Sequence, residues 1–271
     1  MLVSNVRLLA HSLLKNKNLI YQLCKRDILS RYRGTAIGLA WSVFIPILML
    51  ALYTFVFSFV FKARWGDATD LPKEIYALVL YTGMIVHALF TECLSRSATL
   101  MHSNISYVKK VVFPLDTLSW VVFLSSLFQA FIGIFLLLLA NLFITGNLFL
   151  TILFIPIVLI PLFLIIMGIS WFISSVGVYF RDVSHLTGVC STVLMFASPI
   201  FYPVTMLPEN IRPFIYLNPL TYFIEETRNI ILWGEFPAPE NLIVSYIIAV
   251  PIAVFGFSFF QRTRRGFADV L

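Results

Sequence analysis

The residues of this sequence best suited to acid–base chemistry lie together in the stretch NPLTYFIEETRNIILWG, residues 218–234. The adjacent carboxylates of Glu225 and Glu226 are of the kind that form the acid and base of a hydrolase. Neighbouring side chains on a helix point about 100° apart, so these two carboxylates would not face the same substrate bond. We therefore expect no covalent catalysis at this pair.

The same stretch has the pattern of a short amphipathic helix. Asn218 suits the N-cap, Pro219 the first helical position and Gly234 the end of the helix. The apolar face comprises Leu220, Phe223, Ile224, Thr227, Ile230 and Ile231, and the polar face Tyr222, Glu225, Glu226 and Asn229, with Arg228 at its margin. At about 25 Å the helix is too short to cross a bilayer, so we expect it to dip into one leaflet with its polar face toward water.

Other sequence patterns of chemistry are absent. The chain has no GxxxxGK[ST] phosphate loop, no HExxH or GxSxG motif and no cluster of metal ligands. Its three cysteines, Cys24, Cys93 and Cys190, are far apart, which predicts reduced thiols that act as small apolar residues. We expect no catalytic residue, no metal and no cofactor on this chain.

The composition indicates a membrane protein. Hydrophobic residues make up 60% of the chain and charged residues only 12%, against about 25% charged in typical soluble domains. The first 33 residues are polar and basic, and the first long apolar run begins near Thr35, so we expect that run to be a retained span rather than a signal peptide.

Six apolar segments approach the length of about 20 residues that a spanning helix needs. They are residues 35–61, 75–93, 114–143, 150–178, 187–204 and 242–260. The fold class predicted is therefore all-α: one domain over 1–271 with six transmembrane helices. It comprises an amphipathic interface helix within a cytoplasmic region (1–34), the six-span bundle (35–260), which includes short re-entrant helices between spans five and six, and a cytoplasmic tail (261–271).

The basic residues predict the orientation. With the N-terminus inside, 14 of the 19 lysine and arginine residues fall in cytoplasmic segments and most acidic residues fall outside. Both termini are therefore expected in the cytoplasm. The net charge of +6 follows from this bias and from anionic lipid, without a nucleic-acid partner.

Ionisable residues within the spans would mark an ion pathway. The predicted spans hold few: Glu92 and Asp116 lie near cytoplasmic ends, and His87 is the main central candidate, which as a lone histidine also fits a packing role. An ion-coupled carrier is therefore disfavoured, and any transport needs another source of energy.

Three separated motifs resemble one family. RDILSRYRGTAIGLAWSVFIPILMLALYTFVFSFVF (26–61) is similar to the first-span signature of ABC-2 type permeases, in the branch that exports bacterial O-antigen, capsule and teichoic acid. SSVGVYFRDVSHL (174–186) and SPIFYPVTMLPENIRPFIYLNPLTYFIEETRNIILWG (198–234) resemble the same family in the expected order.

The resemblance implies the membrane half of an ATP-driven exporter, closest to the O-antigen type, in the bacterial inner membrane. Two copies would pair, and two separate ATPase subunits carrying ATP and Mg would dock on the cytoplasmic face. The substrate would be a polysaccharide linked to lipid diphosphate, moved outward.

The resemblance also implies roles for four groups of residues, each with a plainer alternative. The ATPase coupling turn would be Tyr179, Phe180, Arg181, Asp182 and His185, which otherwise form a solvated turn. The interface helix and diphosphate contact would be Arg26, Asp27, Arg31 and Arg33, which otherwise only anchor the chain at headgroups. The extracytoplasmic gate would be Asn218, Pro219, Tyr222, Glu225, Glu226 and Arg228, otherwise a surface cap. The channel aromatics would be Tyr53, Phe57, Phe196 and Tyr202, otherwise lipid-facing or core residues.

Three other functions remain open from the sequence. An ABC-2 permease for a drug or lipid would differ from a polysaccharide exporter only in its substrate. A membrane glycosyltransferase or polymerase would show acidic catalytic residues beside a large loop, and an ion-coupled flippase would show more charge within its spans.

Overall fold

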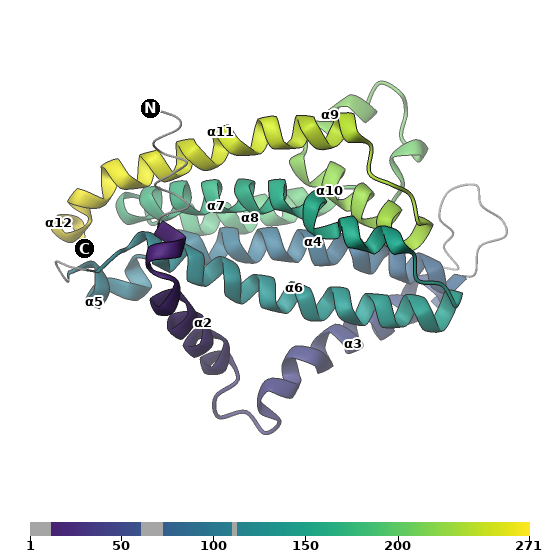
Figure 1. The fold of residues 1–271 in the computed structure, drawn as a ribbon, viewed down its shortest axis with the longest axis horizontal. Coiled ribbons are helices and arrows are strands. Elements are labelled where there is room, and N and C mark those ends of the chain that lie inside the picture. Colours follow the sequence, from purple (N-terminus) through teal and green to yellow (C-terminus); the bar gives the residue numbers. More distant parts are fainter. Residues whose placement is uncertain (1–11, 61–72, 110–112) are drawn as a thin grey trace.

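The computed structural model describes residues 12–60, 73–109 and 113–271, which form helices and turns without any strand (Figure 1). The longer helices are α2 (Lys17–Arg31), α3 (Trp41–Tyr53), α4 (Lys73–Thr99), α6 (Asp116–Thr145), α7 (Ile155–Tyr179), α8 (Val183–Ala197), α10 (Pro219–Arg228) and α11 (Pro239–Thr263). The short helices are α5 (Ile105–Val108), α9 (Arg212–Tyr216) and α12 (Phe267–Val270), and π-helical segments η2 (Thr54–Val60) and η6 (Asn229–Trp233) extend α3 and α10. The all-α prediction is confirmed for these residues.

Five helical stretches of the described chain are long and apolar enough to cross a membrane. They are Gly38–Phe57, Glu74–Thr99, Asp116–Thr145, Leu150–Tyr179 and Pro239–Val270. The predicted span 187–204 differs, because α8 is only 15 residues long, or about 22 Å. Ser198 precedes Pro199 and adopts extended backbone, as residues before proline usually do, so the helix ends there. Six full-length spans are therefore not observed in the described residues.

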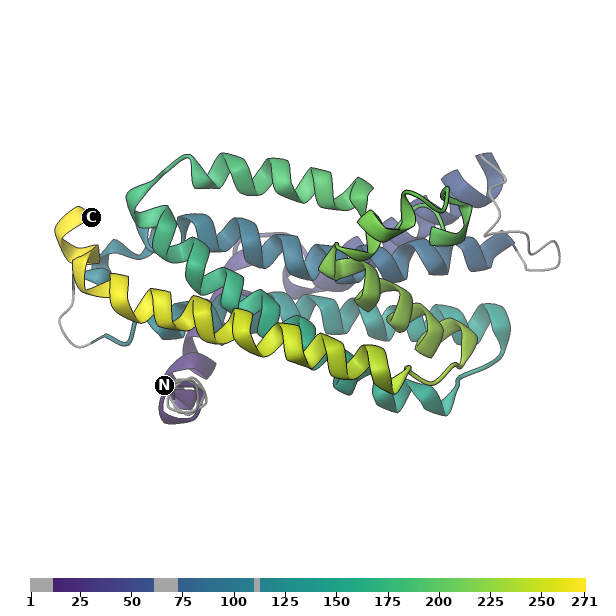
Figure 2. The same cartoon turned by 90° about the horizontal axis from the view of Figure 1, so that it is seen from above.

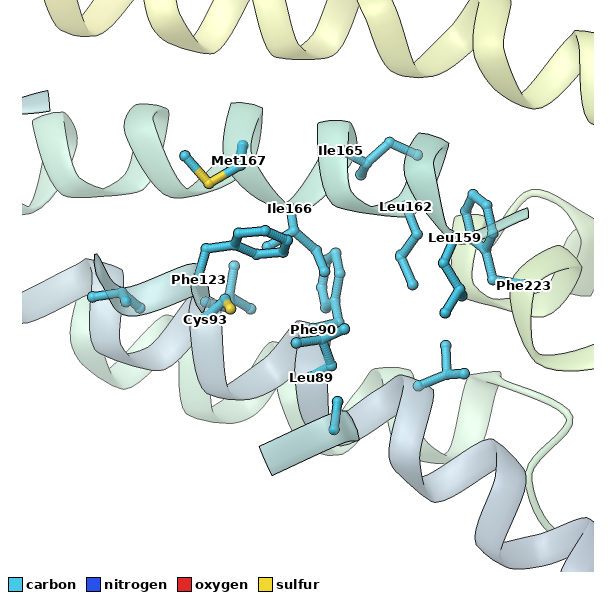
Figure 3. Packing of buried hydrophobic residues seen from close by; sticks show 14 of the residues in the cluster. Leu89, Phe90, Cys93, Phe123, Leu159, Leu162, Ile165, Ile166, Met167 and Phe223 are labelled. Carbon is cyan, nitrogen blue, oxygen red and sulfur yellow. The ribbon is translucent and has the colours of Figure 1, made fainter. Parts of the chain in front are cut away.

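Helix α4 lies at the centre of the bundle. It packs against α6, α7, α8 and α10, and 78% of its apolar window is buried, against 11% for the first span. Figure 1 shows α2 and α3 diverging from the bundle, and Figure 2 shows α8 lying along one edge of it. Figure 3 shows the core between α4, α6 and α7, where Phe90, Cys93, Phe123 and Ile166 meet.

One end of the bundle, which we call the C-terminal end, gathers segments that the sequence predicts to be cytoplasmic. Tyr179 donates a hydrogen bond to the carbonyl of Thr263 (3.4 Å), and a ring nitrogen of His102 lies 3.1 Å from the carbonyl of Gly177. Asp116 accepts a hydrogen bond from Ser12, and its carboxylate lies 3.6 Å from Arg264. Helices α9 and α10 lie toward the opposite end, which we call the α10 end (Figures 1 and 2). The segments predicted to share a side do so, while the direction in which that side faces stays a prediction.

Helices α7 and α11 pack closely through two glycines. A Cβ atom added at Gly256 would lie 1.9 Å from the carbonyl oxygen of Gly168, and one added at Gly168 would lie 2.4 Å from the carbonyl oxygen of Ile252. Small residues let helix backbones approach where lipid provides no hydrophobic drive for association. The contact therefore fixes α11, which forms one wall of the site described below.

This packing predicts that Gly256→Ala destabilises the protein by about 1–3 kcal/mol, because a new methyl group meets backbone that cannot move aside. Gly188→Ala on α8 is the matched control, since a Cβ there meets nothing within 4 Å. The melting temperatures of both purified variants in detergent check the prediction. Equal melting temperatures would contradict the close α7–α11 contact.

Candidate functional site

Helix α10 begins and ends as its sequence predicts. The side-chain oxygen of Asn218 accepts a hydrogen bond from the backbone N–H of Leu220 (3.0 Å), and Pro219 occupies the first turn. The helix continues through η6 to Gly234, which has a φ of 69°, in the left-handed region that glycine tolerates. Residues 218–234 therefore form one helical segment with the predicted caps.

The predicted apolar face of this segment packs on protein. Leu220, Phe223, Ile224, Ile230 and Ile231 are buried, and α10 contacts α4 and α7. The hydroxyl of Thr151 donates to the carbonyl of Ile230 (2.7 Å), which ties η6 to the start of the α7 span. Helices α4 and α7 and the start of the α7 span therefore fix the position of α10 and η6.

Arg228 departs from the prediction, because it is buried rather than at the wet margin of the helix. It is 3% exposed, and its guanidinium donates hydrogen bonds to the carbonyls of Val79 (3.0 Å), Pro199 (2.6 Å) and Ile200 (3.1 Å). The segment that follows α8 covers that side of α10, which the helical spacing alone does not show. Arg228 thus holds backbone in place, and it also contributes to the wall of the cavity described below.

Asn218 acts on the same segment from the other end of α10. Its amide nitrogen donates to the carbonyl of Ala197 (3.2 Å) and to the hydroxyl of Ser198 (2.8 Å). We call Asn218, Arg228 and residues 197–200 the α8–α10 clamp. The clamp supplies donors to the backbone where α8 ends.

The Arg228 side chain passes over Gly83 of α4. A Cβ at Gly83 would lie 2.8 Å from an Arg228 terminal nitrogen, so the glycine leaves room for the guanidinium. Burial lowers the pKa of Arg228 to about 9, while the nearby Glu225 carboxylate opposes that shift. The guanidinium therefore stays charged at neutral pH, and charged donors make the stronger hydrogen bonds.

The polar face of α10 lines a cavity of about 780 Å³ between α10, the preceding segment and α11. Tyr222, Glu225, Glu226 and Asn229 lie on its α10 wall. Burial raises the pKa of Glu225, and the charge of Arg228 opposes the rise. Burial followed by repulsion from Glu225 and Glu235 raises the pKa of Glu226, which is 7% exposed. All six predicted gate residues line this one cavity, and two of them, Asn218 and Arg228, also form the clamp: Asn218, Pro219, Tyr222, Glu225, Glu226 and Arg228. A gate role for the group stays a prediction.

Three of the four predicted channel aromatics gather around Phe201. The ring of Phe201 lies 6.2 Å from Phe57 and 6.1 Å from Phe196, and the Tyr202 hydroxyl donates to the carbonyl of Phe196 (2.8 Å). The Tyr76 hydroxyl donates to the carbonyl of Phe201 (2.7 Å). Sequence reasoning missed Phe201 and Tyr76, although Phe201 adjoins Tyr202 in the same proline-rich stretch.

Tyr53 lies apart from this aromatic cluster. It lines a separate cavity of about 270 Å³ between α3, α4 and α6, with Pro46 and Tyr81. The structure therefore does not group Tyr53 with Phe57, Phe196 and Tyr202.

The predicted coupling turn lies exposed at the C-terminal end. Helix α7 ends at Tyr179 and α8 begins at Val183, so Phe180, Arg181 and Asp182 form the turn. All five predicted residues, Tyr179, Phe180, Arg181, Asp182 and His185, are exposed. Within the described residues, neither Arg181 nor Asp182 makes an ion pair.

Helix α2 is held to α4 by a network of four charged residues, Asp27, Arg31, Glu92 and Arg96. Arg31 lies 2.7 Å from the Glu92 carboxylate and 3.6 Å from that of Asp27, and Arg96 donates to both oxygens of Asp27 at 2.8 Å. The network places Arg31 against carboxylates, where the prediction has it free for a diphosphate. The four side chains are 26–30% exposed, so the network is worth little more than surface pairs.

The other two arginines of the predicted interface group differ from Arg31. Arg26 donates to the Tyr107 hydroxyl (2.9 Å), with its guanidinium 5.8 Å from the centre of that ring, whereas Arg33 is exposed. Ile20 and Leu23 are buried, and α2 packs against α6. A helix is present where the N-terminal interface helix was predicted, and two of its apolar residues pack against the bundle. Its position in the membrane interface stays a prediction.

A family model described as ABC-2 type transporter matches residues 18–232. The chain belongs to the ABC-2 type transporter family. An O-antigen export system permease protein (RfbA) of Klebsiella pneumoniae is 27% identical over 259 residues, covering 94% of this chain and 95% of the relative. RfbA of Myxococcus xanthus is 22% identical over 263 residues (96% and 98% of the two chains), and the polysialic acid transport protein KpsM of Escherichia coli is 23% identical over 225 residues (82% and 83%).

All the candidate residues of this ABC-2 transporter chain, from Arg26 to Arg228, lie inside the matched segment. The segment ends within η6, so α11, the far wall of the 780 Å³ cavity, lies beyond it. The resemblance seen in the sequence is therefore confirmed at the level of the family.

We predict that Arg228→Lys lowers the stability of this ABC-2 transporter by about 3 kcal/mol, since one ammonium cannot replace a guanidinium bonded to three carbonyls. The melting temperature in detergent should fall by roughly 6–12 °C. Arg212→Lys is the matched control, because Arg212 also bonds two carbonyls, of Leu207 and Thr205, but in a more exposed position. An equal effect of the two substitutions would show that burial of Arg228 is not what matters.

Glu226 predicts a pH dependence. Its pKa is raised in the fold, so the fold favours the protonated carboxyl, and its contribution to stability is lost as pH rises from about 4.5 through the folded pKa. Glu226→Gln should therefore raise the melting temperature at pH 8, and the gain should shrink toward pH 4.5. The exposed Glu209, changed to glutamine, should show no such trend. A gain for Glu226→Gln that is largest at acid pH would contradict the assignment.

Proposed function

We propose that this chain is the permease subunit of an ATP-driven exporter that moves lipid-diphosphate-linked polysaccharide, of the O-antigen kind, outward across a bacterial inner membrane. The observation that carries the proposal is the match along 94–96% of the chain to proteins named as O-antigen export permeases. Both termini would face the cytoplasm. Energy would come from two separate ATPase subunits that bind ATP and Mg, since the sequence has no phosphate loop.

The coupling turn supports the docking of an ATPase subunit. Phe180 is 66% exposed and Tyr179 is 43% exposed, and both directly precede the exposed charges of Arg181 and Asp182 in the chain. An exposed aromatic pair beside charges that have no ion-pair partner in the described chain is a surface that a second protein can bind by apolar contact and charge-assisted hydrogen bonds.

The first span and α8 support pairing of two copies around a path for the glycan. The first span is only 11% buried, and Val189, Val193 and Phe196 of α8 are each about 60% exposed. The aromatic cluster around Phe201 lies where η2 meets the end of α8. Its rings offer flat faces on which the C–H faces of sugars stack, without tight binding of any one sugar.

Arg33 is the best-placed residue of the interface group to receive the diphosphate. It is exposed, whereas Arg31 faces Glu92 and Arg26 bonds Tyr107. A guanidinium offers a fork of donors that matches phosphate oxygens.

Deletion of the gene, followed by location of the glycan, tests the function. We expect lipid-linked polysaccharide to be made but to accumulate on the cytoplasmic side, and the wild-type chain to restore it to the surface. Loss of synthesis itself would instead indicate an enzyme of glycan assembly.

We predict that Arg181→Ala or Asp182→Ala reduces export at least tenfold while the chain still inserts and dimerises, because the turn loses its charged contacts with the ATPase. Surface glycan and transport-stimulated ATPase activity are the measurements. Glu209→Ala, which removes an exposed charge toward the α10 end, is the control and should export normally. Normal coupled export in both turn variants would remove the coupling role.

A further inference from the structure

The cavity of about 780 Å³ beside α10 is separate from the aromatic cluster, since neither Phe57, Phe196 nor Phe201 lines it. Its walls carry carboxylates (Glu225, Glu226), amides (Asn229, Asn241) and rings (Tyr222, Trp233). The volume falls within the range of about 300–1,000 Å³ that is usual for small-molecule sites. The proposed transport path assigns no role to these carboxylates, amides and rings.

Glu226 is the residue of the cavity wall that indicates a ligand. It is 7% exposed, and within the described residues it makes no hydrogen bond and no ion pair. A buried polar group without a partner is costly, so such groups normally meet a donor. Arg228 is the nearby cation, but its nitrogens donate hydrogen bonds to three backbone carbonyls, and its charge acts on the pKa of Glu225 rather than on that of Glu226. The Glu226 carboxylate lines the cavity, so its donors come from the water or the ligand that occupies this space.

The combination of groups fits a sugar better than a cation. Hydroxyl groups donate to carboxylates and accept from the amide nitrogens of Asn229 and Asn241, and the C–H face of a pyranose stacks on Tyr222 or Trp233. An ammonium group would be drawn to the carboxylates and rings, but it would leave most of the cavity and both amides unused.

We propose that this cavity binds a sugar unit of the polysaccharide, one per chain, beside the path of export. The inference rests on the proposed function. It assigns to the space between α10 and α11 a specific contact with the glycan, where the aromatic cluster offers only non-specific stacking.

Binding can be measured with the purified full chain in nanodiscs. The probe is the polysaccharide of the cell that encodes this chain, freed of lipid by mild acid and titrated calorimetrically. Val244→Trp fills the cavity from its α11 wall. Ile243→Trp is the matched control, because Ile243 is similarly exposed (59% against 52%) but does not line the cavity. We expect Val244→Trp to weaken binding at least tenfold and Ile243→Trp to leave it unchanged.

A second variant keeps the test decisive if the tryptophan disturbs folding, which the melting temperature would reveal. Asn241→Leu removes an exposed amide of the cavity wall and should also weaken binding at least tenfold. Glu226→Gln should keep part of the affinity, because an amide oxygen still accepts from a hydroxyl. Ethanolamine, titrated alone, should not compete with the glycan.

Failure of this inference is distinguishable from failure of the proposed function. If the wild-type gene restores surface glycan to the deletion strain, but the wild-type protein does not bind the glycan or Val244→Trp binds it equally well, the cavity is no sugar site. Competition by ethanolamine, with loss of all binding in Glu226→Gln, would assign the cavity to an ammonium group instead. If the wild-type gene does not restore surface glycan, the function itself is wrong.

Discussion

A helix that ends within a membrane leaves carbonyl groups that neither water nor a next helical turn can satisfy. Helix α8 stops at Ala197 after about 22 Å, short of the length that a full span needs, so the carbonyls at its end need donors from elsewhere in the chain. Asn218 donates to the carbonyl of Ala197 in the last turn of α8, and Arg228 donates to the carbonyls of Pro199 and Ile200 in the segment that follows. The position of α10 follows from this requirement, and the position of the cavity follows from α10.

The buried charge at the α10 end contrasts with the charges at the C-terminal end. Arg228 is buried, and the three hydrogen bonds that its planar guanidinium donates offset the free-energy cost of removing its charge from water. Asp27, Arg31, Glu92 and Arg96 instead pair with one another near the surface, two acids with two bases, so the network adds no net charge to the α2–α4 contact. Its contribution is to orientation more than to stability, since partly exposed pairs contribute on the order of 1 kcal/mol or less.

Local features of the sequence predicted local structure well. The caps of residues 218–234, the buried face of that helix and the turn at 180–182 depend on neighbours in the chain, and each was predicted at its position. The shortness of α8 also had a local signal in Pro199 and Pro203, but the apolar run around them concealed it. The burial of Arg228 could not be predicted in this way, because the covering residues 199–200 lie 28 and 29 positions away.

Contacts between segments that are distant in the chain were the main features that the sequence could not predict. Asp27 and Arg96 are 69 residues apart, and Arg31 and Glu92 are also far apart in the chain, so a single sequence gives no reason to form either pair. The prediction therefore assigned Arg31 to the diphosphate rather than to Glu92. The cavity shows the same limit. Its carboxylates were recognised as a group on one helical face, but the residues that face them from α11, namely Asn241, Val244, Ser245 and Ile248, come from a span that carries no motif.

Helix α8 joins the two regions to which function is assigned. It starts at the exposed turn and ends in the α8–α10 clamp, and in between the carbonyl of Ser191 lies 3.1 Å from the ring of His87 on α4. A helix is stiff along its axis, so any displacement of the turn along that axis would pass to the other end of α8 rather than be absorbed within 15 residues of regular hydrogen bonding. The shift must instead move the clamp, and with it α10, or break the hydrogen bonds of Asn218 and Arg228. Either result changes the wall of the cavity. A displacement of the turn at the C-terminal end would in this way alter the cavity at the α10 end.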